Sequence, residues 1–270
     1  MNMYLHGIGE IDGEPRISPN DALITDSGDR YDYVLANPPF GKKSSMTITN
    51  EDGSVEKQEL KYSRQDFWAT TSNKQLNFLQ HIRTLLKTNG QAAVVLPDNV
   101  LFEGGAGETV RQQLLKVTDL HTILRLPTGI FYAHGVKANV LFFDNKPAAK
   151  TPWTRDVWIY DYRTNIHHTL KKLPLRRPDL QEFVDLYRAD NRAARAETWS
   201  EDTPDGRWRK YSYDEIVSRD KTNLDIFWLR DDSLTDLENL PAPEVIAEEI
   251  IEGIEAALED FRGVLEELSE

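Results

Sequence analysis

The sequence contains no cysteine, so disulfide bonds and thiolate metal ligands are excluded. It has no apolar run near the ~18 residues that a membrane-spanning helix needs, and no signal peptide is recognisable at its start. The adjacent His167 and His168 lack the spacing of metal ligands, so we expect no metal site. These observations predict a cytoplasmic protein without membrane contact.

Basic residues are also fewer than acidic residues. The chain has 32 Lys and Arg against 45 Asp and Glu, a formal net charge of −13. A protein that binds DNA unaided carries an excess of basic residues, because cations must neutralise the phosphates. Either the partner is not DNA, or another subunit supplies most of the phosphate contacts.

The length and the apolar content predict a globular protein. A chain of 270 residues with 39% hydrophobic and 10% aromatic residues can bury one sizeable core and a second small unit. The apolar run at 33–35, the helical pattern over 73–89 and the apolar run at 92–96 follow one another. This order favours an α/β fold in which the two strands are parallel.

Residues 31–40, Tyr-Asp-Tyr-Val-Leu-Ala-Asn-Pro-Pro-Phe, organise the rest of the chain. The apolar run at 33–35 predicts a short strand that is buried on both faces. Pro38 and Pro39 end this strand, because neither can donate to a sheet ladder. The pattern predicts a stiff turn at the carboxyl end of a strand, where open α/β sheets bind ligands.

The residue types of this turn suit the methylation of an exocyclic amine. The two N–H groups of such an amine need acceptors, which the side-chain oxygen of Asn37 and the carbonyl of Pro38 can provide. Rigid prolines hold both acceptors in place, which is the preorganisation that catalysis needs. Phe40 offers an aromatic face to a base that has left the duplex. The alternative is a proline-rich turn without chemistry.

Asn-Pro-Pro-Phe followed by Gly41 resembles motif IV of the amino-methylating DNA methyltransferases, in the form of the adenine-N6 branch. Three further segments follow in the order seen in modification subunits of type I restriction–modification systems, namely Gly90–Pro97, Leu126–Phe131 and Asn139–Phe143. The resemblance covers residues 1–240. It implies an α/β fold with a partial class I (Rossmann-like) sheet of S-adenosylmethionine-dependent methyltransferases, then a mixed α/β extension and a long C-terminal helix.

We divide the chain accordingly into three parts. Residues 1–150 form the C-terminal part of a catalytic domain, residues 151–240 an extension, and residues 241–270 an acidic heptad helix for subunit assembly. The apolar seam of that helix alternates steps of three and four, at Ala247, Ile250, Ile254, Ala257, Phe261, Val264 and Leu268. We expect this seam to bind a helix of the specificity subunit. Docking onto its own domain is the alternative.

The resemblance also assigns roles to single residues. The catalytic residues are Asn37, Pro38, Pro39 and Phe40, and Asn37 is also a cofactor contact. Asp21 matches an acidic position near the adenine of the cofactor, with a turn or helix-cap aspartate as an equal alternative.

Two further groups of residues are expected around the site. Phe131 and Tyr132 line the pocket for the target base, unless they only fill the core. Lys42, Lys43 and Arg64 belong to a long basic loop over 41–72. This loop either closes over extruded DNA or is a disordered surface insertion.

Local patterns predict the remaining elements. Asp52-Gly53 predicts a hairpin. Ser72 or Asn73 caps the helix over 73–89, and Gly90 ends it. The other predicted elements are helices at 108–118 and 178–187, strands at 92–96, 120–126 and 139–143, and an edge strand at 157–161. Gly104–Gly107 is a weak candidate for a cofactor loop, and we favour a mobile loop that leads to a core helix.

The glycine-rich cofactor loop of a class I methyltransferase is not found in its usual place. Only 36 residues precede Asn37, and they contain no such loop. We expect a gap in the sheet and an uncovered edge on the catalytic strand. The chain then represents the C-terminal part of a modification subunit, from a truncated gene, a split gene or a partial gene prediction, and a complementing N-terminal polypeptide would carry the loop.

The predicted function is S-adenosylmethionine-dependent DNA adenine-N6 methylation within a type I restriction–modification complex. Its partners are DNA, a specificity subunit and a restriction subunit, and the isolated chain is expected to be inactive. One alternative is a non-catalytic remnant that only binds the specificity subunit. Another is an RNA or protein-glutamine N-methyltransferase, because Asn-Pro-Pro turns also serve those substrates.

Overall fold

The computed structural model describes residues 20–41, 45–49, 55–59, 61–131 and 135–231, together with His6 and Ile17. The helices and strands below all belong to the unit Met1–Leu229. The heptad helix predicted for residues 241–270 lies outside the described residues.

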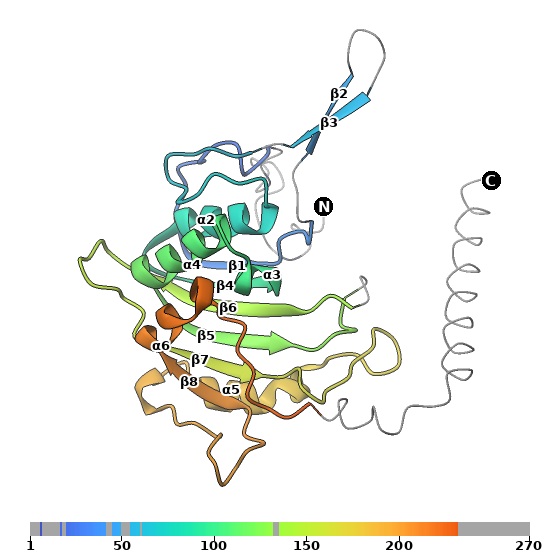
Figure 1. The fold of residues 1–270 in the computed structure, drawn as a ribbon, viewed down its shortest axis with the longest axis vertical. Helices are drawn as coiled ribbons and strands as arrows, with labels where there is room; N and C mark the ends of the chain where they lie inside the picture. The colour runs from blue at the N-terminus through green and yellow to red at the C-terminus, as the bar shows by residue number, and fades with distance from the viewer. Residues whose placement is uncertain are drawn as a thin grey trace, which may run out of the picture. The chain divides into compact units, whose positions relative to one another are not determined.

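A six-stranded mixed sheet forms the centre of this unit (Figure 1). Its strands, from one edge to the other, are β1 (Tyr31–Ala36), β4 (Leu86–Pro97), β6 (Ala138–Asn145), β5 (Thr118–Leu126), β7 (Asp156–Asp161) and β8 (Trp208–Ser212). β1 is parallel to β4 and β5 to β7, while β6 runs antiparallel to both β4 and β5. The α/β fold and the parallel pairing of the first two strands are therefore confirmed.

Short helices connect and cover the strands. The α-helices are α2 (Lys74–Leu85), α3 (Asn99–Phe102), α4 (Ala106–Val117), α5 (Gln181–Tyr187) and α6 (Tyr213–Ser218), and the 3-10 helices are η1 (Arg177–Leu180), η2 (Arg192–Ala194) and η3 (Asp220–Thr222). The hairpin predicted around Asp52-Gly53 is confirmed as β2 (Ser45–Thr49) paired with β3 (Val55–Glu59).

Two apolar clusters lie on opposite faces of the sheet. On one face, α2, α4 and α6 pack on the strands through a cluster that includes Leu79, Leu114 and Ile216. On the other face, α5 packs through Phe183 against Tyr160 and Trp208. In β5, Ile123 belongs to the first cluster and Leu124 to the second, as the alternation of side chains along a strand requires.

The helix predicted for 73–89 is shorter than expected. Asn73 caps it as predicted, because its side chain accepts from the backbone N–H groups of Gln75 and Leu76. The helix ends at Leu85, and the chain enters β4 at once. Gly90 is not a helix cap. A Cβ at this position would lie 2.9 Å from the carbonyl oxygen of Tyr31, so close packing of β1 requires the glycine.

The prediction that β1 is buried on both faces is wrong. Val34 and Ala36 pack on the first cluster, but Tyr33 and Leu35 on the other face are 71% and 84% exposed. The physical reason is that the second cluster, which covers this face of the sheet, contains no residue of β1. β1 also lies at the edge of the sheet, where β4 is its only partner among the described strands. The expectation that this strand has an uncovered edge is confirmed for the part of the chain that the structure describes.

The strand predicted at 157–161 is confirmed as β7, but its predicted position at the edge of the sheet is wrong. β7 lies inside the sheet, because β8 pairs antiparallel with its outer side. β8 has the mostly polar sequence Trp-Arg-Lys-Tyr-Ser. Trp208 stabilises the pairing of β8 with β7, because its ring is fully buried and stacks on that of Trp158, with the ring centroids 5.3 Å apart.

Candidate active site at the carboxyl ends of the strands

The Asn37–Phe40 turn follows β1 directly. Pro38 is buried and Phe40 half-buried, so these two side chains hold the turn against the protein. Asn37 is exposed, and its amide makes no hydrogen bond to any other described residue of the chain. The turn therefore presents a side-chain oxygen that an incoming amine can approach.

Phe131 meets this turn from a distant part of the sequence. Its ring lies 5.0 Å from that of Phe40, at an interplanar angle of 84°. This edge-to-face contact is a favourable aromatic geometry. Phe131 follows the carboxyl end of β5, whereas Phe40 follows that of β1. Two residues predicted for the base site are thus neighbours, while the role of this pair stays a prediction.

The carboxylate of Asp21 is engaged in a local turn. It accepts from the backbone N–H of Leu23 at 2.9 Å and from the hydroxyl of Tyr62 at 3.0 Å. A carboxylate has about four acceptor positions, so two of them are still available to a ligand. The geometry matches the turn alternative and is compatible with a cofactor contact.

The Arg64 side chain packs against the protein rather than extending into solvent. Its guanidinium pairs with Asp66 at 2.7 Å and donates to the carbonyl of Ala22 at 3.2 Å. The side chain is 6% exposed and also lies over the ring of Phe67. These contacts favour a structural role for Arg64 over a DNA contact. The other two basic loop residues, Lys42 and Lys43, and the predicted pocket residue Tyr132 lie outside the described residues.

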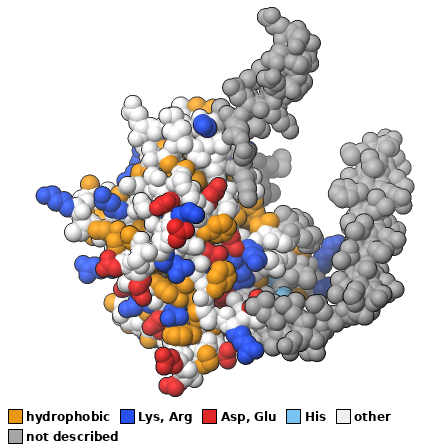
Figure 2. Space-filling model, in the orientation of Figure 1, with side chains coloured by type: hydrophobic (Ala, Val, Ile, Leu, Met, Phe, Trp, Pro, Cys, Tyr) orange, Lys and Arg blue, Asp and Glu red, His pale blue; other side chains and the backbone are white. Residues whose placement is uncertain are grey.

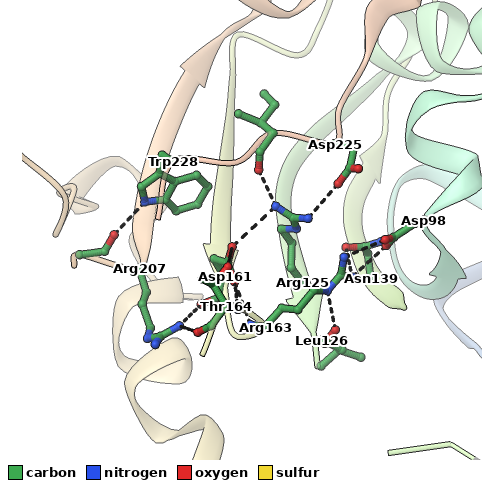
Figure 3. Close-up of polar contacts among 12 residues, drawn as sticks. Asp98, Arg125, Leu126, Asn139, Asp161, Arg163, Thr164, Arg207, Asp225 and Trp228 are labelled. Atoms are coloured by element: carbon green, nitrogen blue, oxygen red, sulfur yellow. Dashed lines mark hydrogen bonds and ion pairs between the residues drawn. The ribbon is translucent and has the colours of Figure 1, made fainter. Parts of the chain in front are cut away.

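Sequence reasoning missed an arginine cluster at the same edge of the sheet (Figure 3). Arg163 forms a bidentate ion pair with Asp98, with both N–O distances at 2.8 Å. Asp98 follows the carboxyl end of β4, and Arg163 follows that of β7. The Asp98-Asn99 and Asp161-Tyr162-Arg163 segments match no catalytic motif, so only their distance from one another in the fold reveals the pair.

A second buried arginine ties the chain after η3 to the sheet. Arg125 donates to the carbonyl of Ile226 at 2.5 Å and pairs with Asp225 at 2.9 Å. Its guanidinium also lies 4.0 Å from the centre of the Phe227 ring. Burial lowers the pKa of Arg125, while the nearby Asp161 opposes that shift. The segment 225–227 is therefore held next to the carboxyl end of β5.

Gly104–Gly107 covers part of the short loop after α3 and the first two residues of α4. A Cβ at Gly104 would come within 3.2 Å of the Lys221 side chain, and Gly105 has a φ of +60°. The helix that follows buries Val110, Leu114 and Leu115, as the sequence predicts. A role for the segment in binding a cofactor stays a weak hypothesis.

Surface charge on the described part of the chain is mixed. Figure 2 shows Lys and Arg side chains interspersed with Asp and Glu over the face in view, with no continuous basic surface on it.

No helix among the residues that the structure describes is long and apolar enough to span a bilayer. The ring of His168 bonds with the hydroxyl of Tyr162 and the carbonyl of Leu173, which occupies both ring nitrogens.

The mixed sheet and the Asn-Pro-Pro-Phe turn at the carboxyl end of a parallel strand define a methyltransferase fold. Residues 1–226 match the N-6 DNA Methylase family model, and the chain belongs to that family. The methylase subunit of the type I restriction enzyme StySPI from Salmonella potsdam is 38% identical over 99% of this chain. The EcoKI methylase subunit from Escherichia coli (strain K12) is also 38% identical over 99% of the chain.

Solved structures agree with this assignment. The crystal structure of the EcoKI M protein matches 100% of this chain and 57% of its own, with a TM-score of 0.69 and 36% identity. A structure from a study of complex assembly in the type I R-M system matches 100% of this chain with a TM-score of 0.62 and 27% identity. The chain spans about half the length of these relatives, 53% for StySPI and EcoKI and 50% for the last structure.

Proposed function

We propose that this chain is the catalytic and assembly portion of a DNA adenine-N6 methyltransferase in a type I restriction–modification complex. The observation that carries the proposal is the exposed Asn37 amide, in the same turn as buried Pro38 and as Phe40, whose ring contacts that of Phe131. Family membership and the two relatives at 38% identity support the same chemistry.

In the reaction, Asn37 and the Pro38 carbonyl accept hydrogen bonds from the two N–H groups of adenine N6. This contact draws the nitrogen lone pair out of conjugation with the ring, so that it can attack a methyl carbon. On accepting the methyl group that a bound S-adenosylmethionine would supply, N6 would release one proton to water. Phe40 contacts the base after it has been flipped out of the duplex.

S-adenosylmethionine supplies the activated methyl group when it is bound. Asn37 and Asp21 are the residues of this chain that we propose to contact it. Both fit, because the Asn37 amide makes no bond within the described residues and the Asp21 carboxylate retains free acceptor positions. The exposed edge and face of β1 support a complementing polypeptide that supplies the remaining cofactor contacts.

The net charge of −13 supports an arrangement in which another subunit of the complex contacts most of the DNA phosphates. We propose that a specificity subunit, bound through the acidic helix predicted for residues 241–270, provides most of the phosphate contacts. A restriction subunit completes the assembly. The DNA site is then read by the specificity subunit rather than by this chain.

The test uses this chain assembled with the complementing polypeptide, the specificity subunit, S-adenosylmethionine and DNA. Asn37→Ala should lower kcat by about 100-fold or more, because one preorganised acceptor is lost during transfer, and should weaken S-adenosylmethionine binding by a smaller factor, because one cofactor contact is lost. Asn37→Asp keeps an acceptor oxygen in place and should retain more activity than Asn37→Ala. Equal activity of Asn37→Ala and wild type would contradict the proposal. A wild-type assembly that binds DNA without methylating it would favour the non-catalytic remnant.

A further inference from the structure

We infer that Arg163 is a positioning residue for the target base, because it clamps both ends of the β5–β6 connection that carries Phe131. The inference rests on the proposed function and adds a residue to it that no catalytic motif contains. Arg163 touches neither Asn37 nor Phe40 in the structure, so it acts through the connection, residues 127–137.

The clamp is formed by one guanidinium group. Its Nε donates to the carbonyl of Leu126, the last residue of β5, at 2.8 Å. Its Nη2 donates to the carbonyl of Ala138, the first residue of β6, at 2.9 Å, and to the side-chain oxygen of Asn139 at 3.2 Å. The two ends of the connection are thus held by one planar guanidinium group, which Figure 3 shows beside Leu126 and Asn139.

Asp98 completes the clamp. It pairs with both Nη atoms of Arg163, accepts from the Asn139 amide at 2.7 Å, and its own backbone N–H donates to the carbonyl of Lys137 at 3.1 Å. The side chains of Arg163 and Asp98 are only 9% and 16% exposed. A bidentate pair shielded from water is stronger and better defined in direction than an exposed one.

The backbone that carries Arg163 is fixed as well. Asp161 accepts from the backbone N–H groups of Arg163 and Thr164, both at 2.8 Å. Arg207 donates to the carbonyls of Asp161 and Thr164 from the other side, at 2.8 and 2.9 Å. The guanidinium therefore has a defined position before any substrate arrives, which is what a positioning group requires.

The same segment supports the connection at a second point. Gly129 has a φ of +81°, and a Cβ there would lie 2.0 Å from the carbonyl oxygen of His168. The backbone of the connection therefore rests directly on His168, only two residues before Phe131. The His168 ring is in turn held by the Tyr162 hydroxyl at 3.0 Å. Residues 161–168 form a continuous support for the Phe131 side of the site.

The topology places this support at the end of the sheet where the Asn37–Phe40 turn lies. β1 is parallel to β4, and both β4 and β5 are antiparallel to β6, so the carboxyl ends of β1, β4 and β5 lie at one edge. A displacement of the connection moves Phe131 away from Phe40, which it contacts at 5.0 Å. Loss of the clamp is then expected to affect the bound base rather than the cofactor.

The first test measures hydrogen–deuterium exchange in the full chain. Arg163→Ala should raise exchange in residues 127–137, and Arg163→Lys should restore little, because an ammonium group cannot reproduce the bidentate fork. The matched control is Arg111→Ala. Arg111 is also a buried arginine that donates to three carbonyls, those of Val100, Lys221 and Thr222, but it touches no part of the connection.

A second variant, Gly129→Ala, tests the same connection if Arg163→Ala does not fold. Gly129→Ala leaves the ion pair intact and displaces the connection from His168 by the clash described above. It should raise exchange in the same segment. Unchanged exchange in both variants, or an equal rise in Arg111→Ala, would overturn the clamp.

The second test uses the assembled enzyme and two DNA duplexes, one with adenine at the target position for the measurement of kcat and one with 2-aminopurine there for the measurement of base flipping. Arg163→Ala and Gly129→Ala should lower kcat by about 10- to 100-fold, since a shift of ~1 Å costs this much in a positioned reaction. Both should reduce the fluorescence of the flipped base and leave KM for S-adenosylmethionine unchanged. Full activity of both variants in an active wild-type background would overturn only the positioning role. Absence of methylation by the wild-type assembly would overturn the proposed function itself.

Discussion

Single buried side chains show how this protein tolerates charge in its interior. His121 is buried at the start of β5, with its Nε2 3.5 Å from a carboxylate oxygen of Asp144. Asp144 also pairs with Arg192 and Lys146. Burial lowers the pKa of His121 to about 4, although its bond with Asp144 opposes the shift. The imidazole is therefore neutral at neutral pH.

This shift predicts a loss of stability in mild acid. The unfolded chain binds a proton at His121 near its usual pKa of about 6.5, but the folded chain does so only near 4. The free energy of unfolding should therefore be unaffected above pH 6.5 and should fall between pH 6.5 and 4, by roughly 3 kcal/mol for the full shift. Urea titrations at several pH values measure this slope.

His121→Asn removes the titrating group and is the matched variant. Its stability should depend less on pH in this window than that of the wild type. Burial also lowers the pKa of His81, which contributes in the same direction in both proteins. Parallel slopes for the two proteins would show that His121 does not contribute to the effect.

Strand β1 illustrates how one element presents two different faces. Val34 packs on the cluster formed with α2 and α4, whereas Leu35 on the opposite face is 84% exposed. Their positions in the sequence are adjacent and both are apolar. Whether Val34 or Leu35 contributes to the stability of the fold depends on what covers each face of the sheet.

We predict that two neighbouring alanine substitutions in the isolated chain differ in their effect on the free energy of unfolding. Val34→Ala should lower the free energy of unfolding by about 1 kcal/mol, because it removes buried methyl groups. Leu35→Ala should stay within about 0.5 kcal/mol of the wild type, because its side chain is in water. Chemical denaturation of the two variants measures both effects. An equal loss in both would mean that the outer face of β1 is covered in solution.

The transition from α2 to β4 depends on a contact between elements. Leu86 leaves the helix because its carbonyl, like that of Lys87, accepts from the Asn145 side chain on β6 at 3.1 Å. Asn89 takes a positive φ of 63°, which asparagine tolerates better than most residues. These contacts outweigh the helical pattern of the sequence up to Asn89.

For the whole molecule, cofactor binding tests whether the chain is sufficient by itself. We predict that the isolated chain binds S-adenosylmethionine weakly or not at all, because Asn37 and Asp21 alone provide too few contacts. Isothermal titration calorimetry measures the affinity directly. Adding a polypeptide that carries the glycine-rich loop should restore binding. Micromolar affinity of the isolated chain would contradict the prediction and would favour the Gly104–Gly107 segment as the cofactor site.

Assembly is the second property that belongs to the whole molecule. Ile254→Asp with Phe261→Asp should release the specificity subunit, because each seam residue contributes roughly 1.5–3 kcal/mol when buried. The catalytic unit, residues 1–229, should remain folded. Pull-down and circular dichroism measure the two properties separately. Glu252→Gln with Glu259→Gln, which lies off the seam, is the control and should lose less binding. A melted catalytic unit with intact partner binding would contradict an assembly role.

Much of this protein follows from the sequence by itself. The Asn-Pro-Pro-Phe turn is predictable because prolines restrict their own backbone and that of the residue before them, wherever they occur. The same holds for the Asn73 cap, the buried positions of α4 and the strands β5 and β6, since each is a local pattern of a few residues. The resemblance of four ordered motifs identified the family in advance.

Other properties depend on contacts between distant parts of the chain, so only the tertiary structure decides them. No local pattern distinguishes Leu35, which is exposed, from Val34, which is packed, because this depends on where β1 lies in the sheet. Arg163 resembles any surface arginine in the sequence. Its partner Asp98 is 65 residues away, and the strand order brings the two together at the carboxyl ends of β4 and β7. Burial then makes their ion pair strong, because little water remains to compete for either charge.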